Sequence, residues 1–64
     1  MLKRVYAESG DTVNLREKPE AKAKILKRVP VGTVAEATAY DSDWSRFAYE
    51  NVEGYMKSKF LVDV

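Results

Sequence analysis

The segment Val13–Pro19, VNLREKP, constrains the fold of this chain more than any other. Val13 and Leu15 are apolar, and they alternate with the polar residues Asn14 and Arg16. Because successive side chains of a strand point to opposite faces, this period of two predicts a strand with one buried face. The proline that ends the segment predicts a turn after it.

Short apolar runs separated by turn-forming residues continue along the chain. The turns are expected at Ser9-Gly10-Asp11, Pro30-Val31-Gly32, Asp41-Ser42-Asp43 and Glu50-Asn51. The strands between them are expected at Leu2–Ala7, Thr12–Glu17, Thr33–Tyr40, Trp44–Tyr49, Val52–Met56 and Leu61–Val64, with one 3₁₀ turn at Lys57–Phe60. This spacing predicts an all-β fold, a small barrel of five to six short antiparallel strands.

The segment Pro19–Arg28, PEAKAKILKR, fits two interpretations. It is rich in good helix formers and begins with a proline, and Ala21, Ile25 and Val29 would share one helical face. A helix of about ten residues is marginal by itself. A loop followed by a strand over Lys24–Val29 fits the same residues equally well.

The composition predicts one small domain, residues 1–64, with a thin core. A chain of this size buries roughly 60% of the surface that it exposes when unfolded. It has no cysteine and no histidine. Disulfides and the common zinc patterns are therefore ruled out, and we expect no metal and no cofactor.

The charge is nearly balanced overall but unevenly spread. The net charge is +1, yet residues 1–32 carry eight Lys or Arg against four Asp or Glu, and the second half is acidic. Nucleic-acid binding usually needs a stronger basic excess, so we do not expect it. No apolar run is long enough for membrane insertion, and the first residues lack the apolar region of a signal peptide. The isolated domain is expected to be a monomer.

Five motifs in sequence order resemble the bacterial Src-homology-3 (SH3) domain family. They are Val5 with Ala7, then VNLREKP, AKILKRVPVG, DWSRF and GYMKSKFL. The resemblance covers nearly the whole chain and implies an SH3-like barrel. It also implies a loop and a strand, not a helix, over Pro19–Arg28.

The chain departs from the family pattern at two places. Lys18 stands where the family commonly has glycine, which predicts either a glycine-like backbone there or a different turn. The strand after Gly32 carries Ala35, Ala37 and Ala39 in place of larger apolar residues. Either this alanine row or Val34 faces the core.

No catalytic group is apparent, and we expect a protein that is not an enzyme. Without histidine or cysteine, the usual acid–base and thiol schemes are absent. Asp41 and Asp43 lie two residues apart. We interpret them as a solvated turn, in preference to a glycosidase carboxylate pair or part of a calcium loop.

Aromatic residues are the main binding candidates. Trp44 follows an acidic loop and opens a strand, so it lies either at a groove edge or in the core; the resemblance favours the groove. Tyr55 points outward if Met56 points into the barrel. Phe60 occupies a position where SH3 domains commonly have a groove-lining tyrosine, and a core position is the alternative. Tyr40 would flank the same cleft from the loop before Trp44.

For the polar residues near these aromatics, we prefer a structural role over a direct contact with a ligand. Asn14 is expected to bond loop backbone, and Arg16 to pair with an acid or stack on a ring. A direct contact of Arg16 with a ligand carboxylate is the alternative. The basic run formed by Lys22, Lys24, Lys27 and Arg28 is either a solvated face or a patch for anionic polymers.

The resemblance implies non-catalytic recognition of cell-wall peptides, which targets an attached hydrolase or envelope protein to peptidoglycan. An extended peptide would lie in a groove of Trp44, Tyr55 and Phe60, with polar selectivity from loops Lys18–Ala23 and Tyr40–Asp43. A location at the cell envelope or outside the cell follows from the family alone. The alternative is a structural or protein–protein assembly module of a larger phage or envelope protein. Recognition of proline-rich segments is disfavoured by the Lys-rich loop and by Lys57, which stands where a groove proline is common.

Overall fold

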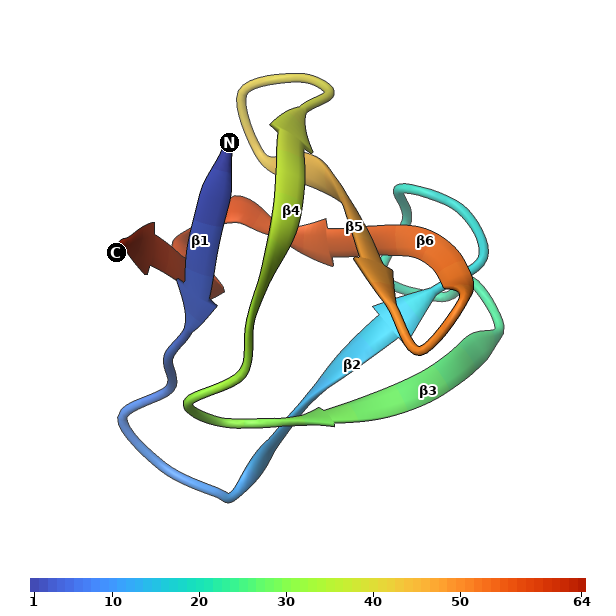
Figure 1. Ribbon diagram of the computed structural model, residues 1–64. Coiled ribbons are helices and arrows are strands. Elements are labelled where there is room, and N and C mark those ends of the chain that lie inside the picture. Colours follow the sequence, from blue (N-terminus) through green and yellow to red (C-terminus); the bar gives the residue numbers. More distant parts are fainter.

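The computed structural model describes residues 1–64 and consists of short antiparallel strands with one 3₁₀ turn (Figure 1). The elements are β1 (Leu2–Val5), β2 (Thr12–Arg16), β3 (Ile25–Pro30), β4 (Val34–Ala39), β5 (Trp44–Tyr49), β6 (Val52–Lys57), η1 (Ser58–Phe60) and β7 (Leu61–Asp63). The strand order in the sheet is β3-β2-β6-β5-β4-β1-β7. The expected all-β SH3-like fold is confirmed, with a 3₁₀ turn near the C-terminus.

The sheet has seven strands, one more than the upper expected number, because the segment that fitted two interpretations adds β3. The two ends of the chain pair with each other. Strand β1 lies between β4 and β7, with Lys3 opposite Asp63 and Val5 opposite Leu61. Lys3 and Asp63 also form an ion pair. The two termini therefore lie on the same side of the molecule (Figure 1).

The segment Pro19–Arg28 forms a loop and then a strand, so the helical interpretation is wrong. Strand β3 pairs with β2 and places Val29 opposite Val13, and both side chains are buried. A short helix would gain little by itself, whereas the strand pairing puts Val29 in the core. Lys18 does not have a positive φ, so the turn differs from the one that glycine would make.

The β5–β6 hairpin turns at Glu50 and Asn51, as the sequence predicts. Both residues have positive φ, 48° and 66°, which is the backbone of a two-residue type I′ turn. This turn sets the register of the whole hairpin. As a result, Trp44 at the start of β5 lies opposite Lys57 at the end of β6.

The core combines large and small side chains from six strands, β1 to β6. Its buried members are Val5, Val13, Leu15, Val29, Ala37, Phe47 and Met56. Phe47 lies opposite Ala37 across β4 and β5, so a small residue makes room for a large one. Val34 and Ala39 are exposed, whereas Ala37 is buried and Ala35 packs against the core, so the face of β4 that carries Ala35 and Ala37 points inward.

Gly54 allows β6 to approach β2 closely. A Cβ atom at this position would lie 2.7 Å from the carbonyl oxygen of Arg16 and 2.9 Å from Cγ of Leu15. Both distances are shorter than real contacts of a Cβ atom, so only glycine fits without a shift. The pairing of Arg16 with Tyr55, next to Gly54, depends on this approach.

Candidate binding groove

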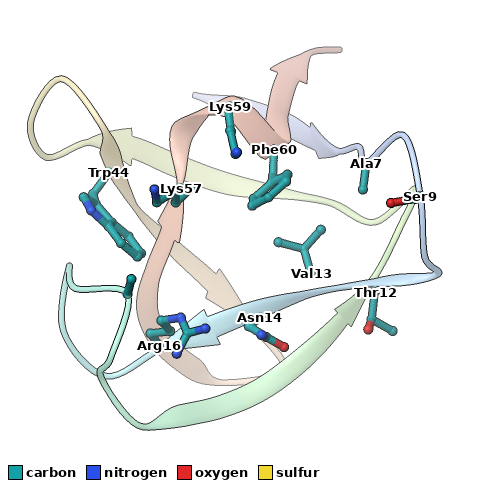
Figure 2. A pocket seen from close by; sticks show the side chains of 11 residues that line it. Ala7, Ser9, Thr12, Val13, Asn14, Arg16, Trp44, Lys57, Lys59 and Phe60 are labelled. Atoms are coloured by element: carbon teal, nitrogen blue, oxygen red, sulfur yellow. The ribbon is translucent and has the colours of Figure 1, made fainter.

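A hollow of about 370 Å³ lies between β2, the start of β5 and the end of β6 with η1 (Figure 2). Its lining residues come from segments far apart in the chain: Ala7, Ser9, Thr12, Val13, Asn14, Arg16, Ala21, Trp44, Lys57, Lys59 and Phe60. The volume is at the lower end of that of ligand pockets. A second hollow shares Ala7, Ser9, Lys59 and Phe60 with it and adds Tyr6 and Glu8.

Trp44 lines this hollow although its side chain is almost covered. It is 8% exposed, but it is not a member of the core cluster. Strand alternation explains this, because Ser45 and Phe47 point inward and Trp44 points to the other face. Oδ1 of Asp41 accepts a hydrogen bond of 2.7 Å from the backbone N–H of Trp44 and one of 2.8 Å from that of Asp43. The preceding loop therefore fixes the backbone from which the indole of Trp44 projects.

Phe60 combines the two roles that the sequence left open. Its half-buried ring packs against the core cluster and also lines the hollow. Its carbonyl oxygen accepts a 2.8 Å hydrogen bond from the N–H of Tyr6, and the N–H of Ser58 donates to the carbonyl oxygen of Asp43 at 2.8 Å. Backbone bonds thus attach η1 to both sides of the hollow.

Arg16 supports the neighbouring loop and also lines the hollow. Its Nη1 donates a 2.9 Å hydrogen bond to the carbonyl oxygen of Ala23, where the sequence had suggested an acidic partner or a ring. Ala21 is the only residue of the loop Lys18–Ala23 that lines the hollow. Asn14 lines it as well.

Tyr40 and Tyr55 lie apart from the hollow and pack against each other. Their ring centroids are 5.1 Å apart at an interplanar angle of 75°, an edge-to-face arrangement. Tyr55 is half-buried and Tyr40 is 55% exposed. The predicted aromatic set is thus divided into two groups, with Trp44 and Phe60 on the hollow and the two tyrosines outside it.

Lys57 and Lys59 are lining residues that the sequence alone did not point to as a site. Nζ of Lys57 lies 5.8 Å from the centroid of the Trp44 ring, and Nζ of Lys59 lies 5.2 Å from that of Phe60 (Figure 2). These are cation–π distances. In the sequence, Lys57 and Lys59 flank Ser58 directly before Phe60. This pattern could have indicated that both lysines lie at the same site as Phe60.

The basic run of residues 22–28 lies elsewhere and is interleaved with acids. Lys27 pairs with Glu50 at 3.3 Å. Lys22 and Lys24 border a depression that Glu17 and Glu20 also line. This mixed surface favours the interpretation as a solvated face.

The structure contains no helix with the length and hydrophobicity that a membrane crossing requires. No three Asp, Glu, His or Cys side chains are grouped so that they could hold a metal ion.

A family model for the bacterial SH3 domain matches residues 11–62, which is most of the chain. The chain belongs to the bacterial SH3 domain family. No curated protein matches it. Membership indicates that this bacterial SH3 domain is a binding module for a protein or peptide. The hollow that Trp44 and Phe60 line is its candidate binding surface.

Proposed function

We propose that this bacterial SH3 domain binds an extended peptide of the cell wall and, without catalysis of its own, brings an attached hydrolase or envelope protein to peptidoglycan. The observation that carries the proposal is the hollow with Trp44 and Phe60 on its walls, in a chain of this family. The whole chain, residues 1–64, acts as one domain in this proposal.

The chemistry of the hollow suits a peptide backbone. Two aromatic rings offer apolar area, and the indole N–H is a hydrogen-bond donor. Asn14 adds an amide that both donates and accepts. A single small open groove of this kind binds weakly, so attachment to a second wall-binding unit raises the effective affinity.

The lining residues support binding over turnover. They include no Asp, Glu, His or Cys. The hollow therefore has neither a carboxylate or imidazole general base nor a thiol nucleophile.

Purified peptidoglycan sacculi and muropeptides test the proposal. We expect the domain to pellet with sacculi, and muropeptides to shift the amide resonances of Trp44 and Phe60. A Trp44→Ala variant that stays folded should lose both effects, while Val34→Ala, on an exposed face of β4, should keep them. No pelleting and no shifts would contradict wall binding. That result would favour assembly, for which the exposed apolar side chains of Leu2, Val34 and Val62 offer a surface.

Tyr40 and Tyr55 remain predicted ligand contacts. In this proposal a bound peptide extends beyond the hollow to the tyrosine pair. Tyr40→Ala should then weaken muropeptide binding while leaving the shift of Phe60 in place. Unchanged affinity in this variant would confine the site to the hollow.

A further inference from the structure

All the charged side chains that line the hollow are positive. Arg16, Lys57 and Lys59 line it, and none of the lining residues is acidic. The chain as a whole has 11 basic and 10 acidic residues, so this local excess does not reflect the composition. Folding has gathered three cations in one place.

These cations have no anionic partner within the chain. The ion pairs of the structure are those of the N-terminal amine with Glu36, Lys3 with Asp63, Lys27 with Glu50 and Arg46 with Glu53. Lys57 and Lys59 lie instead against the aromatic rings. Arg16 uses Nη1 on a backbone carbonyl, which leaves other guanidinium N–H groups free for a ligand.

We infer that the ligand of this groove is an acidic peptide, whose carboxylates meet Arg16, Lys57 and Lys59 while its backbone lies against Trp44 and Phe60. The inference rests on the proposed function and adds the sign of the ligand's charge. Charge-assisted hydrogen bonds from guanidinium and ammonium groups to carboxylates are stronger than neutral ones. A basic peptide would be repelled by the same groups.

The extent of the positive region favours a peptide over a long polyanion. The second hollow, which shares Phe60, includes Glu8, and the lysines of the neighbouring loop alternate with Glu17 and Glu20. A phosphate polymer or a nucleic acid gains affinity from a long track of cations. Here the cations are confined to the hollow, which matches one or two carboxylates on a short segment.

Peptides that differ only in charge test this inference on the intact chain. The probes are an acetylated and amidated Ala-Glu-Ala-Glu-Ala peptide and its counterparts with Gln or Lys in place of Glu. Trp44 is the only tryptophan, so its fluorescence reports the groove. We expect the Glu peptide to bind about tenfold more tightly than the Gln peptide, about threefold for each carboxylate. The Lys peptide should bind most weakly.

Changes in salt concentration and matched variants test whether the preference for the Glu peptide comes from the charges of the hollow. Raising the salt concentration shortens the Debye length from about 8 Å at physiological strength to about 3 Å at 1 M, so the preference for Glu should largely vanish. Lys57→Gln and Lys59→Gln should each weaken binding of the Glu peptide about threefold. Neither variant should change the affinity for the Gln peptide. Lys24→Gln changes the net charge equally but lies off the hollow, and it should have little effect.

The outcomes separate this inference from the proposed function. Equal binding of the Glu and Gln peptides, or an equal loss in Lys24→Gln, would overturn the acidic-peptide inference while sacculus pelleting still supports wall binding. Binding of inorganic polyphosphate without binding of the Glu peptide would overturn it in favour of a phosphate polymer. Failure to pellet together with the expected Glu preference would reject the wall and retain the acidic ligand.

Discussion

Phe47 and Trp44 lie three residues apart on β5 and are both almost fully covered, yet they belong to different parts of the molecule. Phe47 is 1% exposed and is a member of the core cluster, whereas Trp44 is 8% exposed and lines the hollow. Their exposed fractions barely differ. The face of the strand decides their roles, because the odd spacing puts their side chains on opposite sides of β5. In a barrel this small, low exposure alone does not identify a core residue.

Phe47→Ala should have the largest effect on stability. It removes a fully buried ring from a close-packed core and leaves a cavity, at a cost of about 3–5 kcal/mol. A domain of this size has only a few kcal/mol of stability in total, at about 0.05–0.15 kcal/mol per residue. We expect the variant to be largely unfolded by circular dichroism at 25 °C. A cooperative unfolding transition close to that of the parent chain would show that Phe47 is not the central core residue.

Gly54→Ala tests the approach of β6 to β2, on which both the core and the hollow depend. The new Cβ would meet the Arg16 carbonyl oxygen at 2.7 Å. We expect a loss of about 1–3 kcal/mol as the strands move apart. Urea denaturation measures the loss. Because the Arg16–Tyr55 pairing moves too, the amide resonances of both residues should shift, and an unchanged spectrum would contradict the close approach.

Trp44→Ala should cost less stability than Phe47→Ala but more binding. The hollow is open to water, so the loss is the transfer term without a sealed cavity, about 2 kcal/mol. Urea denaturation and titration with the peptide ligand measure the two effects. Trp44→Phe keeps an aromatic wall and should retain part of the affinity. If Trp44→Ala unfolds the chain as Phe47→Ala does, the distinction between the two sides of β5 is wrong.

The ion pair of Lys3 and Asp63, which joins β1 and β7 away from β5, should have the smallest effect on stability. The hydrogen bond and charge of Lys3 hold the pKa of the exposed Asp63 carboxyl below its ordinary value. A carboxyl with a pKa lower in the folded than in the unfolded chain contributes stability at neutral pH. That contribution is lost as the pH falls through the lowered pKa, and it is small because the pair is exposed.

Thermal unfolding across the acidic range, with Asp63→Asn as the comparison, measures this effect. The variant should lack the part of the pH dependence that comes from Asp63, and peptide binding should stay unchanged. A variant with the same acid dependence as the parent chain would show that the Lys3–Asp63 pair contributes nothing.

Most of the fold could be predicted from the sequence, because side-chain alternation and turn-forming residues determine local structure. The alternation of Val13 and Leu15 predicted β2 with its buried face, and Glu50-Asn51 marked the hairpin turn. The residue pattern alone did not separate helix from strand over Pro19–Arg28, because helix formers and apolar spacing there satisfy both; the resemblance to the bacterial SH3 family implied the loop and strand that the structure has. Pairing with β2, and the burial of Val29 beside Val13, made the difference.

The candidate site was predicted less completely. Trp44 and Phe60 were singled out from the sequence and line one hollow, whereas Tyr40 and Tyr55 form a separate pair. Strand alternation places Tyr55 on the outward face but says nothing of which loop covers it. Arg16 was a candidate for contact with a ligand carboxylate, but Lys57 and Lys59 were not predicted as site residues. The three cations come from β2, β6 and η1, which are distant in the chain, so their grouping could not be predicted.

The sequence by itself determined the strands, their turns and the inward residues of β2, because side-chain periodicity and turn propensity act over a few residues. Only the tertiary structure decided that Ala37 of β4 lies opposite Phe47, and that Arg16, Lys57 and Lys59 share one hollow. The physical reason is that closing the sheet brings distant segments together. Packing and electrostatic contacts between such segments depend on distances that no local pattern encodes.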